Sequence, residues 1–151
     1  MKGIAIVFGA LLVALPARAD AVLDVIRTAG LLGTWAESCA AGPSRWNWFV
    51  TFYVTGNSTV RRKGETGGDD PVLDGAVDSA QRVTPTMVRL RLRNDDPNWG
   101  PDNGTIYDAE AELRDGKWHV LNSVRRDGTQ LIKDGKFVAS GKPTPVLQRC
   151  N

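Results

Sequence analysis

The sequence predicts an all-β domain in which antiparallel strands follow one another as an up-and-down meander and form a small eight-stranded barrel. Most of the chain consists of short runs in which apolar and polar side chains alternate, the period-2 pattern of half-buried strands. Between these runs lie Gly-Asn and Asp-Gly dipeptides, which favour the tight turns of antiparallel hairpins. A helix is expected only over Ala21 to Ala29, before the first strand.

Residues 1–19 have the pattern of an export signal. Lys2 supplies a positive charge, residues 4–15 form an apolar run, and Ala17-Arg18-Ala19 is typical of a cleavage site. We therefore expect cleavage near Ala19, one mature domain over residues 20–151, and a periplasmic or secreted location. The apolar run is shorter than the ~20 residues that cross a bilayer, and no later run matches it, so the mature protein is expected to have no membrane span.

The charge composition argues against one class of partner. The full chain has 19 Lys and Arg against 17 Asp and Glu. Cleavage near Ala19 removes Lys2 and Arg18 but no acid, which leaves equal numbers of basic and acidic side chains. Without a general excess of positive charge, we expect no nucleic-acid partner.

Cys39 and Cys150 are the only cysteines of the chain. In an oxidising compartment, such a pair predicts a disulfide. The alternative of redox-active or metal-binding thiols is disfavoured, because there is no C-x-x-C spacing and the chain has a single histidine. The predicted bridge would tie the end of the first strand to the penultimate residue.

Turn residues divide the mature chain into successive strands. Tight hairpin turns are expected at Gly56-Asn57, Asp115-Gly116, Asp127-Gly128 and Asp134-Gly135. The expected strands are Leu32 to Cys39, Asn47 to Thr55, Ser58 to Lys63, Val72 to Val83, Met87 to Arg93, Thr105 to Arg114, Lys117 to Arg126, Thr129 to Lys133, Lys136 to Val138 and a short last strand, Val146 to Arg149.

The Asp115-Gly116 turn also predicts the pairing register of the hairpin around it. The face expected to be buried carries Tyr107, Ala109, Ala111, Leu113, Trp118, Val120, Asn122 and Val124. Glu112 and His119 then face solvent, opposite one another. Residues 87–93 alternate in the same way, with three arginines on one face, which we interpret as a solvated row; the alternative is an anion-binding stripe.

In an up-and-down meander, consecutive connections lie at alternate ends of the barrel. One end receives the tight connections at 56–57, 84–86, 115–116 and 134–135, and the other receives 40–46, 64–71, 94–104 and the tight 127–128. The first end is therefore expected to be closed and the second open. Open ends of small barrels are common ligand sites.

Gly33-Thr34-Trp35 follows the expected helix and opens the first strand. These residues resemble the G-x-W start of the calycin superfamily, which includes lipocalins and avidin-like proteins. The resemblance implies a lipocalin-like barrel whose closed end is plugged by Trp35 and whose interior takes a small molecule. A second lipocalin motif is not found, and the basic residue that would stack on Trp35 is at best Arg149. Biotin binding is not expected, because Glu37 stands where the avidin-like pocket has an Asn.

A broader resemblance concerns the C-terminal half. The Arg125-Arg126-Asp127-Gly128 turn, the Lys133-Asp134-Gly135-Lys136 turn and the terminal Cys150 are similar to those of small exported alphaproteobacterial proteins. This resemblance implies a compartment and no activity.

Catalytic patterns are scarce. His119 is expected to form a surface ion pair with Glu112 rather than to act as a base or a metal ligand. The sequence has neither a phosphate-binding G-x-x-x-x-G-K run nor a G-x-G-x-x-G run. Asp69-Asp70, Asp95-Asp96 and Asp102 do not have the spacing of a calcium loop. We therefore expect no enzyme, no cofactor and no metal site.

The leading functional expectation is a periplasmic module that binds a small molecule at the open end. The ligand class expected is an apolar molecule with an acidic end, because basic groups lie near that rim. The candidate ligand-binding residues are Trp99, Tyr107, Asn122, Arg62, Arg93 and Arg125, with Trp99 as a lid and Tyr107 and Asn122 as inward polar groups.

Two alternatives are a protein-binding module and an envelope protein without a ligand. The G-x-W start and the disulfide resemble bacterial periplasmic protease inhibitors, although the bridge of those inhibitors lies within the barrel. A cavity would favour the small molecule, whereas a filled interior with exposed Trp46, Trp48 or Trp99 would favour a protein partner.

Overall fold

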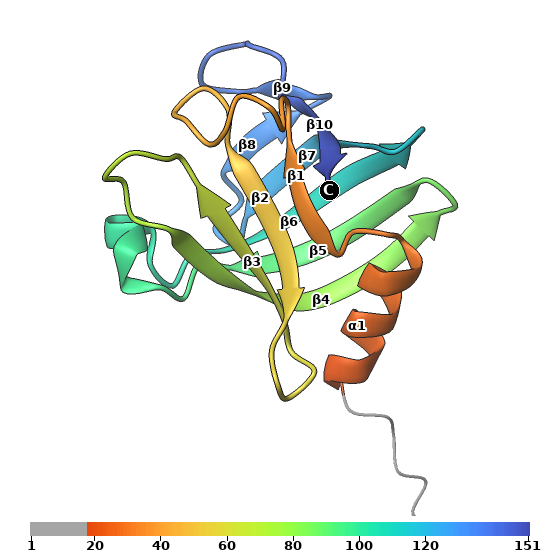
Figure 1. The fold of residues 1–151 in the computed structure, drawn as a ribbon. Helices are drawn as coiled ribbons and strands as arrows, with labels where there is room; N and C mark the ends of the chain where they lie inside the picture. The colour runs from red at the N-terminus through yellow and green to blue at the C-terminus, as the bar shows by residue number, and fades with distance from the viewer. Residues whose placement is uncertain (1–17) are drawn as a thin grey trace, which may run out of the picture.

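The structure, a computed structural model, describes residues 18–151 and their side chains from residue 21 onward. These residues form an all-β barrel with one helix near the N-terminus (Figure 1). Residues 1–17 of the expected signal peptide lie outside the described residues, so export and the cleavage position stay predictions. None of the helices that the structure describes is long and apolar enough to cross a membrane.

The strands follow the expected order, with shifts at their ends. The elements are α1 (Arg18–Thr28), β1 (Gly33–Ala36), β2 (Phe49–Val54), β3 (Val60–Glu65), β4 (Leu73–Thr84), β5 (Met87–Arg93), the 3₁₀ helix η1 (Pro97–Asp102), β6 (Ile106–Arg114), β7 (Lys117–Arg125), β8 (Gln130–Lys133), β9 (Lys136–Phe137) and β10 (Val146–Cys150). The largest difference is at β1, which ends three residues earlier than expected.

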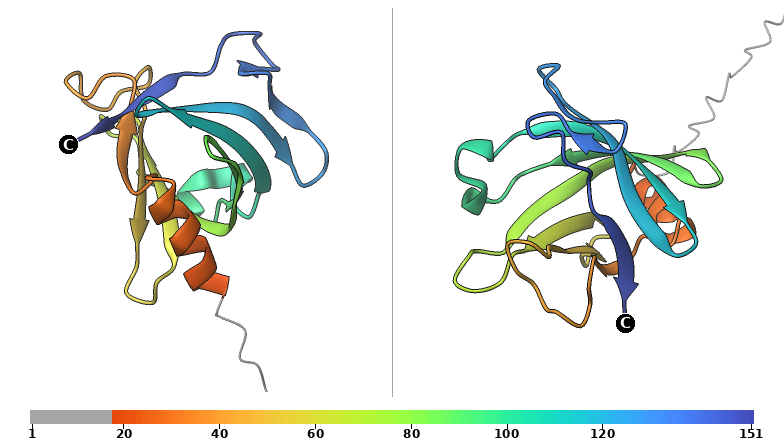
Figure 2. Two further views of the ribbon diagram at one scale, coloured as in Figure 1. Left: turned by 90° about the vertical axis from the view of Figure 1, so that its right-hand side faces the viewer. Right: turned by 90° about the horizontal axis from the view of Figure 1, so that it is seen from above.

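All strands belong to one antiparallel sheet whose closure is made by the last strand. From β1 to β9 each strand pairs with the next, as in a meander, and β10 pairs with both β1 and β7. The closed barrel therefore has eight strands, β1 to β7 and β10. The β8–β9 hairpin continues from the second half of β7 and remains outside the closure, as the view along the barrel shows (Figure 2).

The two ends of the barrel differ as the loop lengths predict. The turns between β2 and β3, β4 and β5, and β6 and β7 lie at one end, whereas η1 and the β3–β4 loop lie together at the other (Figures 1 and 2). Helix α1 packs against β4 and β3 at the closed end. Gly30 adopts a left-handed conformation (φ 75°) directly after the helix, which lets the chain turn into β1.

Large side chains fill the barrel beside the helix. Trp35 and Phe52 both make edge-on contacts with Trp118, with ring centroids 6.3 and 5.3 Å apart. The Trp35 indole N–H donates to the Leu31 carbonyl (2.8 Å), just after α1. The buried apolar cluster consists of Val22, Leu23, Ile26, Leu31, Trp35, Phe52, Val60, Val77, Val88, Leu90, Leu92, Ala109, Ala111, Trp118 and Leu147.

A one-residue bulge corrects the expected register of the β6–β7 hairpin. The pairs from Arg114–Lys117 to Ala111–Val120 are as predicted, but Leu121 is an extra residue on β7. After this bulge Glu110 faces Asn122, so Asn122 and Val124 turn to the outer face. The expectation that these two residues line the interior is wrong. Ser123 and Arg125 take the inward positions instead.

Two of the four expected two-residue turns have the primed geometry. Both residues of Asp115-Gly116 and of Asp134-Gly135 have positive φ. In the other two hairpins a single loop residue has positive φ, Ser58 in one and Gly128 in the other. Each of these loops has three residues rather than two. A backbone hydrogen bond closes each loop, from Thr55 N–H to the Thr59 carbonyl and from Arg125 N–H to the Thr129 carbonyl (both 2.9 Å).

Cys39 and Cys150 form the predicted disulfide, with Cα atoms 5.4 Å apart. Strand β10 runs antiparallel to β1 and places Cys150 opposite Thr34. A first strand that extended to Cys39 could not satisfy this register. Because β1 ends at Ala36 and the chain bends at Glu37, Cys39 lies beside Cys150. The same register places Arg149 opposite Trp35.

Candidate functional site at the open end

The open end is framed by the long loops and contains two groups of side chains with different surroundings. One is the turn around Trp46, which projects from the β1–β2 loop. The other is a cluster of Arg62, Trp99 and Tyr107 at the mouth of the barrel.

Trp46 is the most exposed large apolar side chain among the described residues, at 83%. It lies in a two-residue turn with Arg45, which is also exposed. The turn is closed by reciprocal backbone hydrogen bonds between Ser44 and Asn47, both 3.0 Å long. The backbone therefore holds the indole ring out into solvent.

Asn47 is buried and fixes the whole β1–β2 loop. Its side-chain amide donates to the carbonyl oxygens of Ser38 (2.8 Å) and Gly42 (2.7 Å), and its Oδ1 accepts from Ser38 N–H (3.1 Å). Next to Ser38, Cys39 is anchored to Cys150 by the disulfide. The loop that presents Trp46 is thus tied down at several points, which lowers the entropy that it would lose on binding a partner.

A second loop supports the first one. Gly67 (φ 72°) approaches so closely that a Cβ atom there would lie 2.2 Å from the Pro43 carbonyl oxygen, so no other residue fits. Trp48, which is 43% exposed, lies over Gly64 of β3, with ring atoms 3.6 and 3.7 Å from the position of a Cβ. Glycines thus allow the loop and Trp48 to lie directly on neighbouring backbone.

Arg62 points into the mouth of the barrel from β3. It pairs across the sheet with Phe52, whose side chain lies in the core. Its guanidinium carbon lies 5.4 Å from the centroid of the Trp99 ring and 5.5 Å from that of Tyr107. It donates to the Tyr107 hydroxyl and to Asn94 Oδ1 (3.2 Å).

Helix η1 holds Trp99 over this arginine. The Trp99 indole N–H donates to the Asp74 carbonyl of β4, and Asp96 caps η1 by accepting from Asn98 N–H (2.8 Å). Trp99 thus lies against Arg62, and its expected role as a lid stays a prediction. It remains half-buried, so one side of the cluster faces solvent.

Arg125 reaches the mouth from the opposite wall. The bulge at Leu121 places it inward, opposite Tyr107. Its Nη2 lies 3.1 Å from Asp102 Oδ1 of η1, whereas its Nε is buried and has no hydrogen-bond partner among the described residues.

The arginines of β5 lie outside the barrel and are paired with acids. Arg89 binds Glu110 (2.6 Å) and Arg91 binds Asp108 (2.8 Å) from β6. The hydrogen bond from Arg89 holds the pKa of Glu110 below its usual value, and that from Arg91 does the same for Asp108. Arg93 binds Asp78 (2.9 Å) and Asp95 (3.1 Å). This neutralised ladder disfavours an anion-binding stripe on the outer face.

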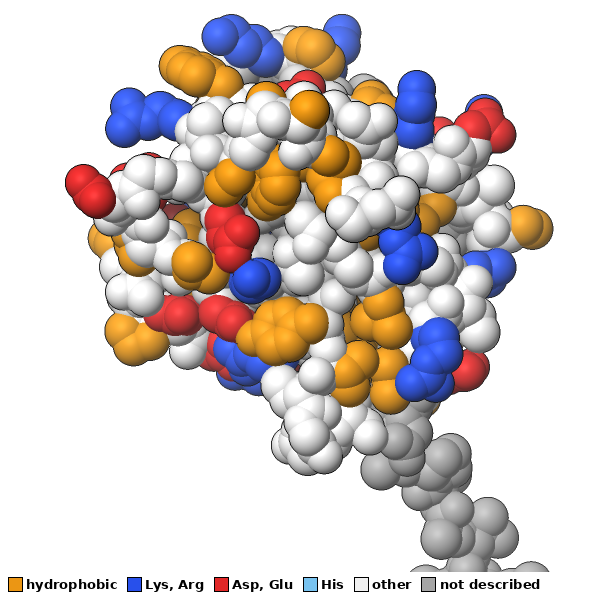
Figure 3. Space-filling model, in the orientation of Figure 1, with side chains coloured by type: hydrophobic (Ala, Val, Ile, Leu, Met, Phe, Trp, Pro, Cys, Tyr) orange, Lys and Arg blue, Asp and Glu red, His pale blue; other side chains and the backbone are white. Residues whose placement is uncertain are grey.

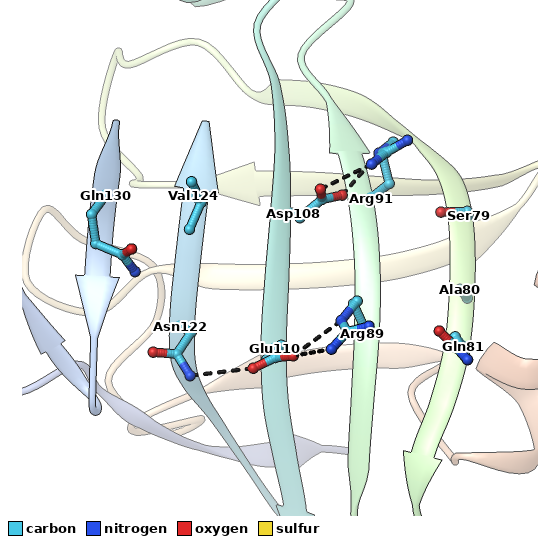
Figure 4. Close-up of a pocket in the computed structure, with 10 residues that line it drawn as sticks. All are labelled: Ser79, Ala80, Gln81, Arg89, Arg91, Asp108, Glu110, Asn122, Val124 and Gln130. Carbon is cyan, nitrogen blue, oxygen red and sulfur yellow. Dashed lines mark hydrogen bonds and ion pairs between the residues drawn. The ribbon is translucent and has the colours of Figure 1, made fainter. Parts of the chain in front are cut away.

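Two hollows stand out in the described part of the chain, and both lie outside the barrel. The larger, of about 730 Å³, is a polar groove across β4 to β8, lined by the ion pairs of Arg89 and Arg91 with Asn122 and Gln130 (Figure 4). The smaller, of about 180 Å³, lies near the rim between Arg91 and Arg126 and touches Tyr107. Basic and acidic side chains are also interspersed over the face seen in Figure 3.

The structure brings four of the six candidate residues together. Arg62 contacts both Trp99 and Tyr107, and Arg125 pairs with Tyr107 on the neighbouring strand. Arg93 and Asn122 lie on the outer face, where Asn122 donates to Glu110 (3.3 Å).

Two buried residues of the open end were not predicted from the sequence. Asn94 continues the inward series of Leu90 and Leu92 and could have been found by extending the alternation by one step. Asn47 has no such signal, because its role depends on how the loop folds back onto Ser38.

His119 lies on the outer face as predicted, but not beside a free carboxylate. Its Nε2 is 2.9 Å from Thr144 Oγ1, which also bonds to the Val120 carbonyl (2.8 Å). Glu112 pairs instead with Arg114 (2.7 Å). The expected His119–Glu112 ion pair is therefore wrong, because the segment before β10 covers the histidine.

The fold is compatible with the calycin resemblance at the level of an eight-stranded closed antiparallel barrel. Comparisons with protein-family models, with curated proteins and with solved structures find no match.

Proposed function

We propose that this protein is a protein-binding module that uses the open-end loops, with Trp46 as its main contact. The observation behind the proposal is the presentation of Trp46, which is exposed to solvent on a loop held by a disulfide and by the buried Asn47. Tryptophan is enriched among residues that dominate binding energy, and a fixed loop loses little entropy when it docks.

The packing of the closed half supports this choice over a small molecule held deep in the barrel. The rings of Trp35, Phe52 and Trp118 occupy the closed half, and neither described hollow opens into it. The partner is expected to offer an apolar pocket for the indole. Arg45, beside Trp46 in the same turn, favours an acidic rim around that pocket.

The test is retention of a partner by matched variants. Wild-type protein, Trp46→Ala and Val83→Ala are immobilised and exposed to a cell-envelope extract and to purified serine, cysteine and metalloproteases. Val83 is the control because it is also exposed and apolar but lies next to the turn between β4 and β5, at the closed end.

A protein retained by wild type and Val83→Ala, but not by Trp46→Ala, is then purified and its affinity measured. Direct binding that falls on Trp46→Ala supports the proposal, and inhibition of a protease would define the partner class. If every retained protein binds Trp46→Ala as well as wild type, the proposal is wrong.

A further inference from the structure

The mouth of the barrel contains positive charge that the protein itself leaves uncompensated. On the outer face, Arg61, Arg89 and Arg91 each have a carboxylate partner within 2.8 Å. Arg62 faces inward from β3, and within residues 18–151 its hydrogen-bond acceptors are the Tyr107 hydroxyl and the Asn94 amide oxygen. No carboxylate of the described residues forms an ion pair with it.

Arg125 is a second arginine at the mouth, and it is ion-paired with Asp102. Arg62 donates to the Tyr107 hydroxyl, and Arg125 pairs with Tyr107 across the β6–β7 hairpin. Among the described residues, Asp102 is the one acid that forms an ion pair with either arginine. Because Nε of Arg125 is buried without a partner, one of its five N–H donors is unused in the described part of the chain. A partly buried cation is stabilised by an anion that accepts its hydrogen bonds.

The strand beside Arg62 contains a glycine that the backbone packing requires. Gly75 pairs with Arg62 across the sheet, and a Cβ at Gly75 would lie 3.7 Å from Arg62 Nη2 and 2.6 Å from the Arg93 carbonyl oxygen. A side chain at this position would therefore collide with the backbone.

We propose that Arg62 and Arg125 form a site for a small carboxylate at the mouth of the barrel. The planar guanidinium of arginine matches a carboxylate in geometry, and the rings of Trp99 and Tyr107 provide apolar surface for a group attached to it. Below the site, Phe52 and Leu92 belong to the packed core, so a long acyl chain has no room inside. The ligand is therefore a short or aromatic acid whose remainder points outward. The site is separate from Trp46 and does not depend on the protein-binding proposal.

Benzoate titration followed by ¹H–¹⁵N NMR tests this site, with the Trp99 indole as the reporter. Wild-type protein should show a saturable shift of that indole signal. Arg62→Gln should weaken benzoate binding about tenfold or more, which is the loss of one charge-assisted hydrogen-bonded contact. Arg89→Gln, which removes an exposed arginine of the outer ladder away from Tyr107, should change the affinity less than about twofold.

Arg125→Gln is the second variant, because Arg62→Gln also removes contacts to Tyr107 and Asn94. It should weaken benzoate binding while leaving the signals of the core residues in place. Decanoate should bind no more tightly than benzoate, since its tail cannot enter the core. A shift that does not saturate, an affinity unchanged in both variants, or tighter binding of decanoate would overturn the proposal.

Discussion

At the closed end of the barrel, Trp35 and Trp118 pack against each other and Phe52 beneath α1, whereas at the open end Trp46 and Trp48 face solvent. The same residue type thus serves two purposes in one small domain. A buried indole is stabilising because it removes apolar surface from water, but an exposed one in a fixed turn contributes little to folding. The closed half thus maintains the fold, and we propose that the open half is used for binding.

Truncation of a ring in the closed half should have the largest effect. Trp118→Ala is expected to lower the free energy of unfolding by ~3–5 kcal/mol, because it leaves a cavity between Trp35 and Phe52. Urea unfolding measures this. Trp118→Phe should cost less than Trp118→Ala, because a smaller ring still fills part of the site and the indole N–H has no partner among the described residues. Equal losses in the two variants would contradict the packing argument.

Removal of the disulfide should act on both halves. Cys39→Ser combined with Cys150→Ser is expected to cost ~2–5 kcal/mol in the free energy of unfolding, because the bridge closes a long loop of the unfolded chain. It should also increase hydrogen exchange in the β1–β2 loop more than at the turn between β6 and β7. An equal increase in hydrogen exchange in the two regions would show that the bridge does not specifically hold the Trp46 loop.

The outer ion pairs should make a smaller, pH-dependent contribution to the free energy of unfolding. The pKa of Glu110 is lowered in the folded protein by Arg89, so the charged carboxylate favours folding above the pKa of the unfolded chain. This contribution is lost as the pH falls through the lowered pKa of the folded state. Arg89→Gln should therefore reduce stability slightly at pH 7 and flatten its decline in acid.

Arg126→Gln is the matched control for the ion-pair prediction, since Arg126 is exposed and has no ion pair among the described residues. It should leave the pH dependence of unfolding unchanged. A decline in acid of the same steepness in Arg89→Gln and wild type would contradict the role of this pair.

The closed half could be predicted from the sequence further than the open half. Leu90 and Leu92 alternate with arginines, and the Asp115-Gly116 turn determines the pairing next to it. The bulge at Leu121 could not be predicted, because both registers place apolar and polar side chains on each face of β7. It turns Arg125 inward and Asn122 outward, so the predicted facing of β7 was wrong beyond Leu121. The bend at Glu37 likewise follows from the pairing of β10 with β1, a contact between the two ends of the chain.

The most direct test of the division between the two halves is the affinity of Trp46→Ala for the partner retained by wild-type protein. The exposed side chain predicts a free energy of unfolding within about 0.5 kcal/mol of wild type. If Trp46 dominates the contact, the affinity should fall about 30-fold or more, whereas Val83→Ala should bind as wild type does. An unchanged affinity of Trp46→Ala, or a large loss of its stability, would contradict the assignment of the open-end tryptophan to binding.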